Sequence, residues 1–106
     1  MSGPAVRRAK LLASVYRAYG AAAVWTRVGG GAPLTPTVRH RSEDEPIDFG
    51  ESSALRRANR VWVRKSEVPA PCRGDTIVDE EGSFRVIAEP RLEPNGLEWL
   101  CEVAEV

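Results

Sequence analysis

The fold is decided by the stretch Arg60-Val61-Trp62-Val63-Arg64-Lys65-Ser66-Glu67-Val68. Its side chains alternate with period two, which is typical of a β-strand, and the prolines at positions 69 and 71 end it. Val61, Trp62 and Val63 present apolar groups to both faces of this strand. Both faces must therefore be covered, and we expect the domain to cover one and a neighbouring subunit the other.

The same alternation recurs along the chain. Residues 22–28 and 34–41 flank the turn Gly29-Gly30-Gly31-Ala32-Pro33 and predict a hairpin. Residues 75–79 and 83–88 predict a second hairpin, with Gly82 where a positive φ is needed. Residues 97–103 form the last strand, in which Glu98 and Glu102 are expected to face water. The inward residues of that strand are Leu97, Trp99, Cys101 and Val103. About six strands at this spacing predict a mainly β fold, a small antiparallel barrel or sandwich.

Residues 4–19 predict an amphipathic helix, because Pro4 suits the first turn and Gly20 suits the position after the end. Its narrow apolar side carries Ala5, Ala9, Leu12, Tyr16 and Tyr19. So thin a stripe holds a helix weakly, or orders it only against another subunit. We therefore divide the chain into a basic N-terminal arm, residues 1–20, and a β-domain, residues 21–106.

Residues 42–59 stand apart as an acidic insertion between the second and third predicted strands. Eighteen residues is long for a connection in a small domain, so we expect a functional loop that is mobile in the free protein, with one or two helical turns at 51–59. Its candidate residues are Glu43, Asp44, Glu45, Asp48, Phe49 and Glu51.

Charge is divided unevenly along the chain. The first 42 residues hold seven basic residues and no acid, whereas residues 43–106 hold eight basic and fifteen acidic residues. A molecule with one basic and one acidic end suits head-to-tail packing against its own copies, or contact with an anionic partner at one end.

The sequence carries no enzyme motif: no P-loop, no Gly-x-Ser-x-Gly and no His-Glu-x-x-His. His40 is the single histidine, predicted to be solvated at a strand end without convergent ionisable neighbours. We therefore expect no catalytic residues, no cofactor and no metal. Cys72 and Cys101 are expected to be reduced, and no apolar run is long enough to cross a membrane.

Three tryptophans, Trp25, Trp62 and Trp99, sit in the middle of predicted strands. We interpret them as core or subunit-interface residues, the alternative being exposed rings that stack on nucleic-acid bases. The residues assigned to assembly contacts are Arg7, Arg8, Lys10, Leu12, Tyr16, Tyr19, Trp25 and Trp62.

The C-terminal half resembles the small head–tail joining proteins of tailed bacteriophages and of prophage-derived particles. The resemblance rests on residues 61–71, on Arg73-Gly74-Asp75-Thr76-Ile77-Val78, on residues 82–86, and on Glu93-Pro94-Asn95-Gly96-Leu97-Glu98-Trp99. The first predicted hairpin also matches, so the likeness covers most of residues 22–103.

This resemblance implies a non-enzymatic protein of the virion neck. Such proteins form a ring below the portal or adaptor, close the DNA channel and bind the tail terminator or tail tube. It further implies that the acidic insertion, Glu43 to Glu51 by position, lines the channel beside packaged DNA. The alternative is a small barrel that binds nucleic acid through the basic N-terminal segment.

Overall fold

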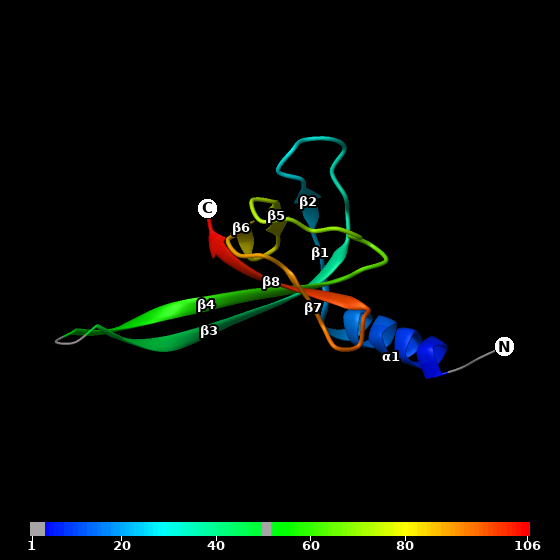
Figure 1. Cartoon of the computed structure of the whole chain (residues 1–106), viewed down its shortest axis with the longest axis horizontal. Coiled ribbons are helices and arrows are strands. Elements are labelled where there is room, and N and C mark those ends of the chain that lie inside the picture. The colour runs from blue at the N-terminus through cyan, green and yellow to red at the C-terminus, as the bar shows by residue number, and fades with distance from the viewer. Residues whose placement is uncertain (1–3, 50–51) are drawn as a thin grey trace.

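The computed structural model describes the backbone of residues 4–49 and 52–106, and the side chains of residues 6–41 and 59–106 (Figure 1). The elements follow in the order α1 (Pro4–Tyr19), β1 (Ala21–Ala22), β2 (Val24–Thr26), β3 (Thr37–Phe49), β4 (Ser52–Arg64), β5 (Thr76–Asp79), β6 (Gly82–Val86), β7 (Arg91–Leu92) and β8 (Glu98–Glu105). The described chain is thus mainly β with an N-terminal helix, as the sequence predicts.

The strands form one antiparallel sheet that nearly closes into a barrel. Its order is β1-β3-β4-β8-β6-β5-β2, and β7 pairs with β8 outside this path. The two end strands, β1 and β2, follow one another directly in the chain, so a single short segment joins both edges of the sheet. Closure of this kind leaves few edges open for pairing with other chains.

The barrel interior is filled by alternate residues of these strands, as period two requires. The buried cluster consists of Ala23, Trp25, Val38, Val61, Val63, Val68, Ile77, Phe84, Val86, Cys101 and Val103, with Leu34 and Trp99 packed against it. The inward positions predicted for the last strand are confirmed at Trp99, Cys101 and Val103.

The first predicted hairpin is present but divided between two partners. β1 pairs with the start of β3, with Ala21 opposite Val38, and the same register continues to a bridge between Trp25 and Leu34. The other edge of β2 pairs with β5. The sequence missed this division because alternation shows which residues share a face and not which edge meets which partner.

The second hairpin is confirmed. β5 and β6 pair from Thr76 opposite Arg85 to Asp79 opposite Gly82, which leaves Glu80 and Glu81 as the turn. Gly82 has φ of 139°, a conformation that other residues rarely adopt.

The prediction of a loop with helical turns at residues 42–59 is wrong. β3 and β4 continue through this segment as a two-stranded ribbon, paired from Val38 opposite Val63 to Phe49 opposite Ser52. We call residues 42–58 the arm. β8 pairs with β4 only from Asn59 to Arg64, so the arm extends beyond the barrel (Figure 1). The acids and turn-forming residues of this segment are typical of a loop, but β-pairing along a ribbon needs no apolar alternation.

The strand predicted at residues 60–68 ends earlier than expected, at Arg64, and residues 65–67 form a turn. Helix α1 has the predicted bounds and lies at the end of the molecule opposite the arm (Figure 1). Gly20 closes the helix, and its amide donates to the Tyr16 carbonyl at 2.8 Å. A Cβ at Gly20 would lie 2.4 Å from that carbonyl oxygen and 2.5 Å from the Thr37 methyl group, so only glycine fits this close approach.

Candidate functional site

Helix α1 is attached to the outer face of the barrel by one tyrosine set among charged groups. Tyr16 is 1% exposed, and its hydroxyl donates to Glu98 Oε2 at 2.6 Å. Arg39 donates to the same oxygen at 3.0 Å, and Asn95 donates to Glu98 Oε1 at 3.1 Å. We call Tyr16, Arg39, Trp62, Arg64 and Glu98 the Tyr16 cluster.

Two guanidinium groups lie over the Tyr16 ring, that of Arg39 at 5.3 Å and that of Arg64 at 4.8 Å from its centroid. Arg39 also lies 5.2 Å from the centroid of the Trp62 ring. Each such contact contributes about 0.5–2 kcal/mol, depending on desolvation. The helix that was predicted to be weakly attached is therefore docked by the chain's own cluster.

This environment shifts two pKa values. Burial raises the pKa of Tyr16, and the hydrogen bond to the Glu98 carboxylate raises it further. Burial disfavours the charge of Arg39, but its interactions with Glu98 and Tyr16 outweigh that effect and raise its pKa. The cluster thus holds a neutral phenol between an anion and two cations.

Three sequence predictions are corrected by this cluster. Glu98, expected to face water, is 5% exposed, because Tyr16 of α1 and Arg39 of β3 lie against its carboxylate. The outer face of Trp62, expected to be covered by a neighbouring subunit, is covered in part by Arg39 of the same chain, and Trp62 is half-buried. Tyr16 is buried within its own chain, so the prediction that it contacts another subunit is wrong. No signal in the sequence identifies Glu98 as a buried residue. A polar position on a strand is expected to face solvent unless the element that covers it is known.

Trp25 is also withdrawn from the assembly surface, since it is fully buried. Its indole Nε1 donates to Asp75 Oδ2 at 3.0 Å, which also accepts from the Cys72 amide at 2.9 Å. Asp75 Oδ1 accepts from the Val28 amide at 2.9 Å. Asp75 is 1% exposed and ties two loops to the barrel, a structural role.

The remaining predicted assembly residues lie at or near the surface of α1. Arg7, Arg8 and Lys10 are exposed, Leu12 is half-buried and Tyr19 is 78% exposed. Leu12 lines a groove of about 330 Å³ together with Ala9, Arg64, Lys65, Ser66, Gly96 and Leu97. With Arg17, which is also exposed, the helix therefore presents four basic groups and one exposed aromatic ring to solvent.

The acidic candidates fall on the arm. Glu43, Asp44, Glu45, Asp48 and Phe49 belong to β3, and their side chains lie outside the described residues, as does Glu51 entirely. In the β3–β4 register, Arg57 of β4 lies opposite Asp44 of β3, and Arg56 lies opposite Glu45. The arm therefore carries both signs of charge along its length.

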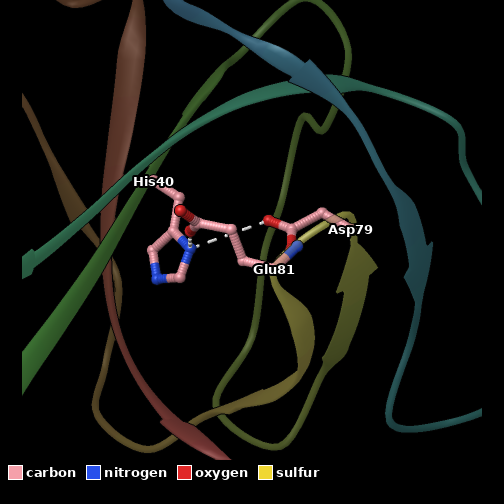
Figure 2. A group of neighbouring side chains, drawn as sticks. All are labelled: His40, Asp79 and Glu81. Atoms are coloured by element: carbon pink, nitrogen blue, oxygen red, sulfur yellow. Dashed lines mark hydrogen bonds and ion pairs between the residues drawn. The ribbon is translucent and has the colours of Figure 1, made fainter.

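His40 is not the solvated histidine that the sequence predicts. Its side chain is 7% exposed, and Figure 2 shows Asp79 and Glu81 turned toward it from the β5–β6 turn. His40 Nδ1 lies 3.8 Å from Asp79 Oδ2 and pairs with Glu81 Oε2, while the ring meets Phe84 edge-on at 4.5 Å. The prediction that no ionisable residues converge on His40 is wrong, because β3 and the β5–β6 turn are distant in sequence but meet at one mouth of the barrel.

The two cysteines are free: Cys72 is exposed and Cys101 is buried. Burial and the nearby Asp75 carboxylate raise the pKa of Cys101 to about 12, which keeps this thiol protonated and unreactive. In the described part of the chain, no helix is both long enough and apolar enough to span a membrane.

The structure thus defines a small β-barrel protein with a basic helix at one end and an extended two-stranded ribbon at the other (Figure 1). The chain matches the family model described as Phage Head-Tail Attachment protein over residues 5–103. It therefore belongs to the phage head–tail attachment family and is a structural component of the bacteriophage virion that takes part in tail attachment. A search of the curated proteins finds no significant match.

Proposed function

We propose that this chain forms a closed ring in the virion neck, below the portal or adaptor, and that the ring closes the DNA channel and binds the tail. In this arrangement the arm points into the channel, and α1 contacts a neighbouring copy or the ring above. The role is architectural and involves no catalysis.

The observation that carries this proposal is the length of the arm. The molecule measures 60 × 31 × 23 Å, and the arm extends along its longest direction away from the barrel (Figure 1). An isolated two-stranded hairpin is at best marginally stable in water, so a ribbon of this length gains most from contacts with other chains. Adjacent copies around a ring would bring such ribbons together at the axis.

The charge of the arm suits a channel that DNA must leave. Residues 42–58 hold five acidic and two basic residues. An acidic excess repels phosphates and prevents adhesion of the duplex, while the paired positions of opposite charge along β3 and β4 limit repulsion between the two strands. The contact with packaged DNA is then non-specific.

The direct test shortens the arm and keeps the barrel. Replacing residues 43–58 with Asn-Gly leaves Ser42 and Asn59 as the closing pair of a short hairpin. We expect this variant to fold, by circular dichroism, and to yield particles that leak DNA or fail to join tails.

A matched variant separates the shape of the arm from its charge. Neutralising Glu43, Asp44, Glu45 and Asp48 to the corresponding amides keeps the full length, so we expect tails to join while DNA exit slows. If the shortened protein does not fold, the arm is part of the domain's structure, and if its particles retain DNA and infect normally, the channel role is wrong.

A further inference from the structure

Three side chains, those of His40, Asp79 and Glu81, meet at the mouth of the barrel, and two of their buried polar atoms make no hydrogen bond in the described part of the chain. His40 Nδ1 and Asp79 Oδ2 make no hydrogen bond among the described residues. The side chain of His40 is 7% exposed and that of Asp79 is 1% exposed, so water does not satisfy them as it would at the surface. Unpaired buried groups of this kind are costly and call for an explanation.

The contact made by the Nε2 atom of His40 indicates the state of the Nδ1 atom. His40 Nε2 lies 3.3 Å from Asn59 Oδ1, and the tautomer with its hydrogen on Nε2 donates to that carbonyl oxygen. The neutral ring then has its lone pair at Nδ1, directed at the carboxylates of Asp79 and Glu81 (Figure 2). Two carboxylates that face one ring nitrogen favour a positive centre there, which is either a proton on Nδ1 or a bound cation.

A proton on Nδ1 does not satisfy all three groups. It would serve Glu81 Oε2, but Asp79 Oδ2 is 3.8 Å from Nδ1, beyond hydrogen-bond distance, and would stay buried and unpaired. Asp79 Oδ1 is already engaged, because it accepts from the Glu81 amide at 2.8 Å and so fixes the orientation of the carboxylate. A single cation coordinated by all three groups would satisfy them once the Glu81 side chain turns outward to make room.

We propose that His40, Asp79 and Glu81 bind a divalent transition-metal ion of the zinc class, with water completing the coordination. The three ligand atoms lie within 4.8 Å of one another. Bonds of about 2.1 Å in a tetrahedral zinc site place ligand atoms roughly 3.4 Å apart, close to the spacing of His40 Nδ1 and Asp79 Oδ2. Glu81 is 53% exposed in its side chain and is free to move outward as the ion enters.

This ion would fix the base of the arm to the far side of the barrel. His40 lies on β3 two residues before the arm begins, whereas Asp79 and Glu81 belong to the β5–β6 hairpin, which is not adjacent to β3 in the sheet. Asn59, whose side chain contacts His40 Nε2, is the first residue of β4 that pairs with β8. The metal would therefore set the direction in which the arm leaves the domain, independently of whether the chain forms a ring.

The test uses the full chain without a histidine tag, freed of metal with a chelator and carrying Cys72→Ser, because the exposed Cys72 thiol is a competing zinc ligand. Calorimetric titration with zinc chloride should give one ion per chain and a raised melting temperature that EDTA reverses. His40 is the only histidine, so its ring signals in nuclear magnetic resonance should shift to those of a metal-bound Nδ1.

Variants assign the ligands. His40→Ala and Asp79→Asn should each weaken zinc binding at least tenfold, and Asn59→Ala should weaken it about 10–100-fold by releasing the ring. Glu80→Gln, the exposed neighbour in the same turn, should bind as the parent does.

Two results would overturn the proposal: no binding by the Cys72→Ser chain in a large molar excess of zinc, or binding that leaves the histidine signals unchanged. The resonance measurement needs no substitution of a proposed ligand, so it decides the question even if His40→Ala fails to fold.

Discussion

Tyr16 shows how a helix with little apolar surface is held to a barrel. Its ring lies between two guanidinium groups and its hydroxyl donates to a buried carboxylate, so the attachment depends on charge and hydrogen bonding. Removing one partner from such a cluster leaves others buried without compensation.

Replacing Tyr16 with Phe keeps the ring and removes only the donor to Glu98. Because Glu98 retains Arg39 and Asn95, we expect a loss of about 1–2 kcal/mol in the free energy of unfolding, measured by urea titration with an unchanged slope. Tyr19→Phe is the matched control, since Tyr19 is 78% exposed on the same helix and should change stability by less than about 0.5 kcal/mol. Equal effects of the two substitutions would contradict the role of the hydroxyl.

The same contact predicts a response to alkaline pH. The pKa of Tyr16 is raised on folding above its ordinary value of about 10, so above that pH the folded chain binds more protons than the unfolded chain. Its contribution to stability is complete below about pH 10 and is lost as the pH rises toward the folded pKa. The stability difference between the parent and Tyr16→Phe should therefore shrink above about pH 10, and a constant difference would show that the phenol pKa is not shifted.

At the scale of elements, the sequence predicted what local periodicity controls. The bounds of α1 follow from Pro4 and Gly20, and the β5–β6 hairpin follows from Gly82. Prediction from the sequence failed where segments that are distant along the chain determine the structure. The arm was mistaken for a loop because an acidic ribbon carries no apolar alternation, and the environments of Glu98 and His40 depend on α1 and on the β5–β6 turn.

The exposed face of α1 predicts an assembly phenotype. Deleting the helix would remove Tyr16 from the cluster and mix folding with assembly, so charge reversal is the cleaner change. We expect Arg7→Glu, Arg8→Glu and Lys10→Glu together to leave the melting temperature nearly unchanged but to slow incorporation into particles in a salt-dependent way.

The matched control reverses three exposed basic residues of the barrel, Arg73, Arg85 and Arg91, and changes the net charge by the same amount. It should incorporate faster than the helix variant. Equal rates for the two triple variants would show that only total charge matters and that the helix has no particular partner.

At the scale of the whole molecule, the basic helix and the arm lie at opposite ends of the longest axis (Figure 1). Head-to-tail contacts around a closed ring let unlike surfaces of adjacent copies meet without facing like charges. Exposed ion pairs contribute only about 0–1 kcal/mol each, so the charges would set orientation while apolar groups such as Leu12 and Tyr19 supply contact energy.

The most direct measurement is electron cryomicroscopy of complete particles without imposed symmetry in the neck. We predict a closed ring of this chain between capsid and tail, with each β3–β4 arm directed at the channel axis and α1 against an adjacent protein. A neck that lacks the chain, or a ring whose arms point away from the axis, would contradict the account.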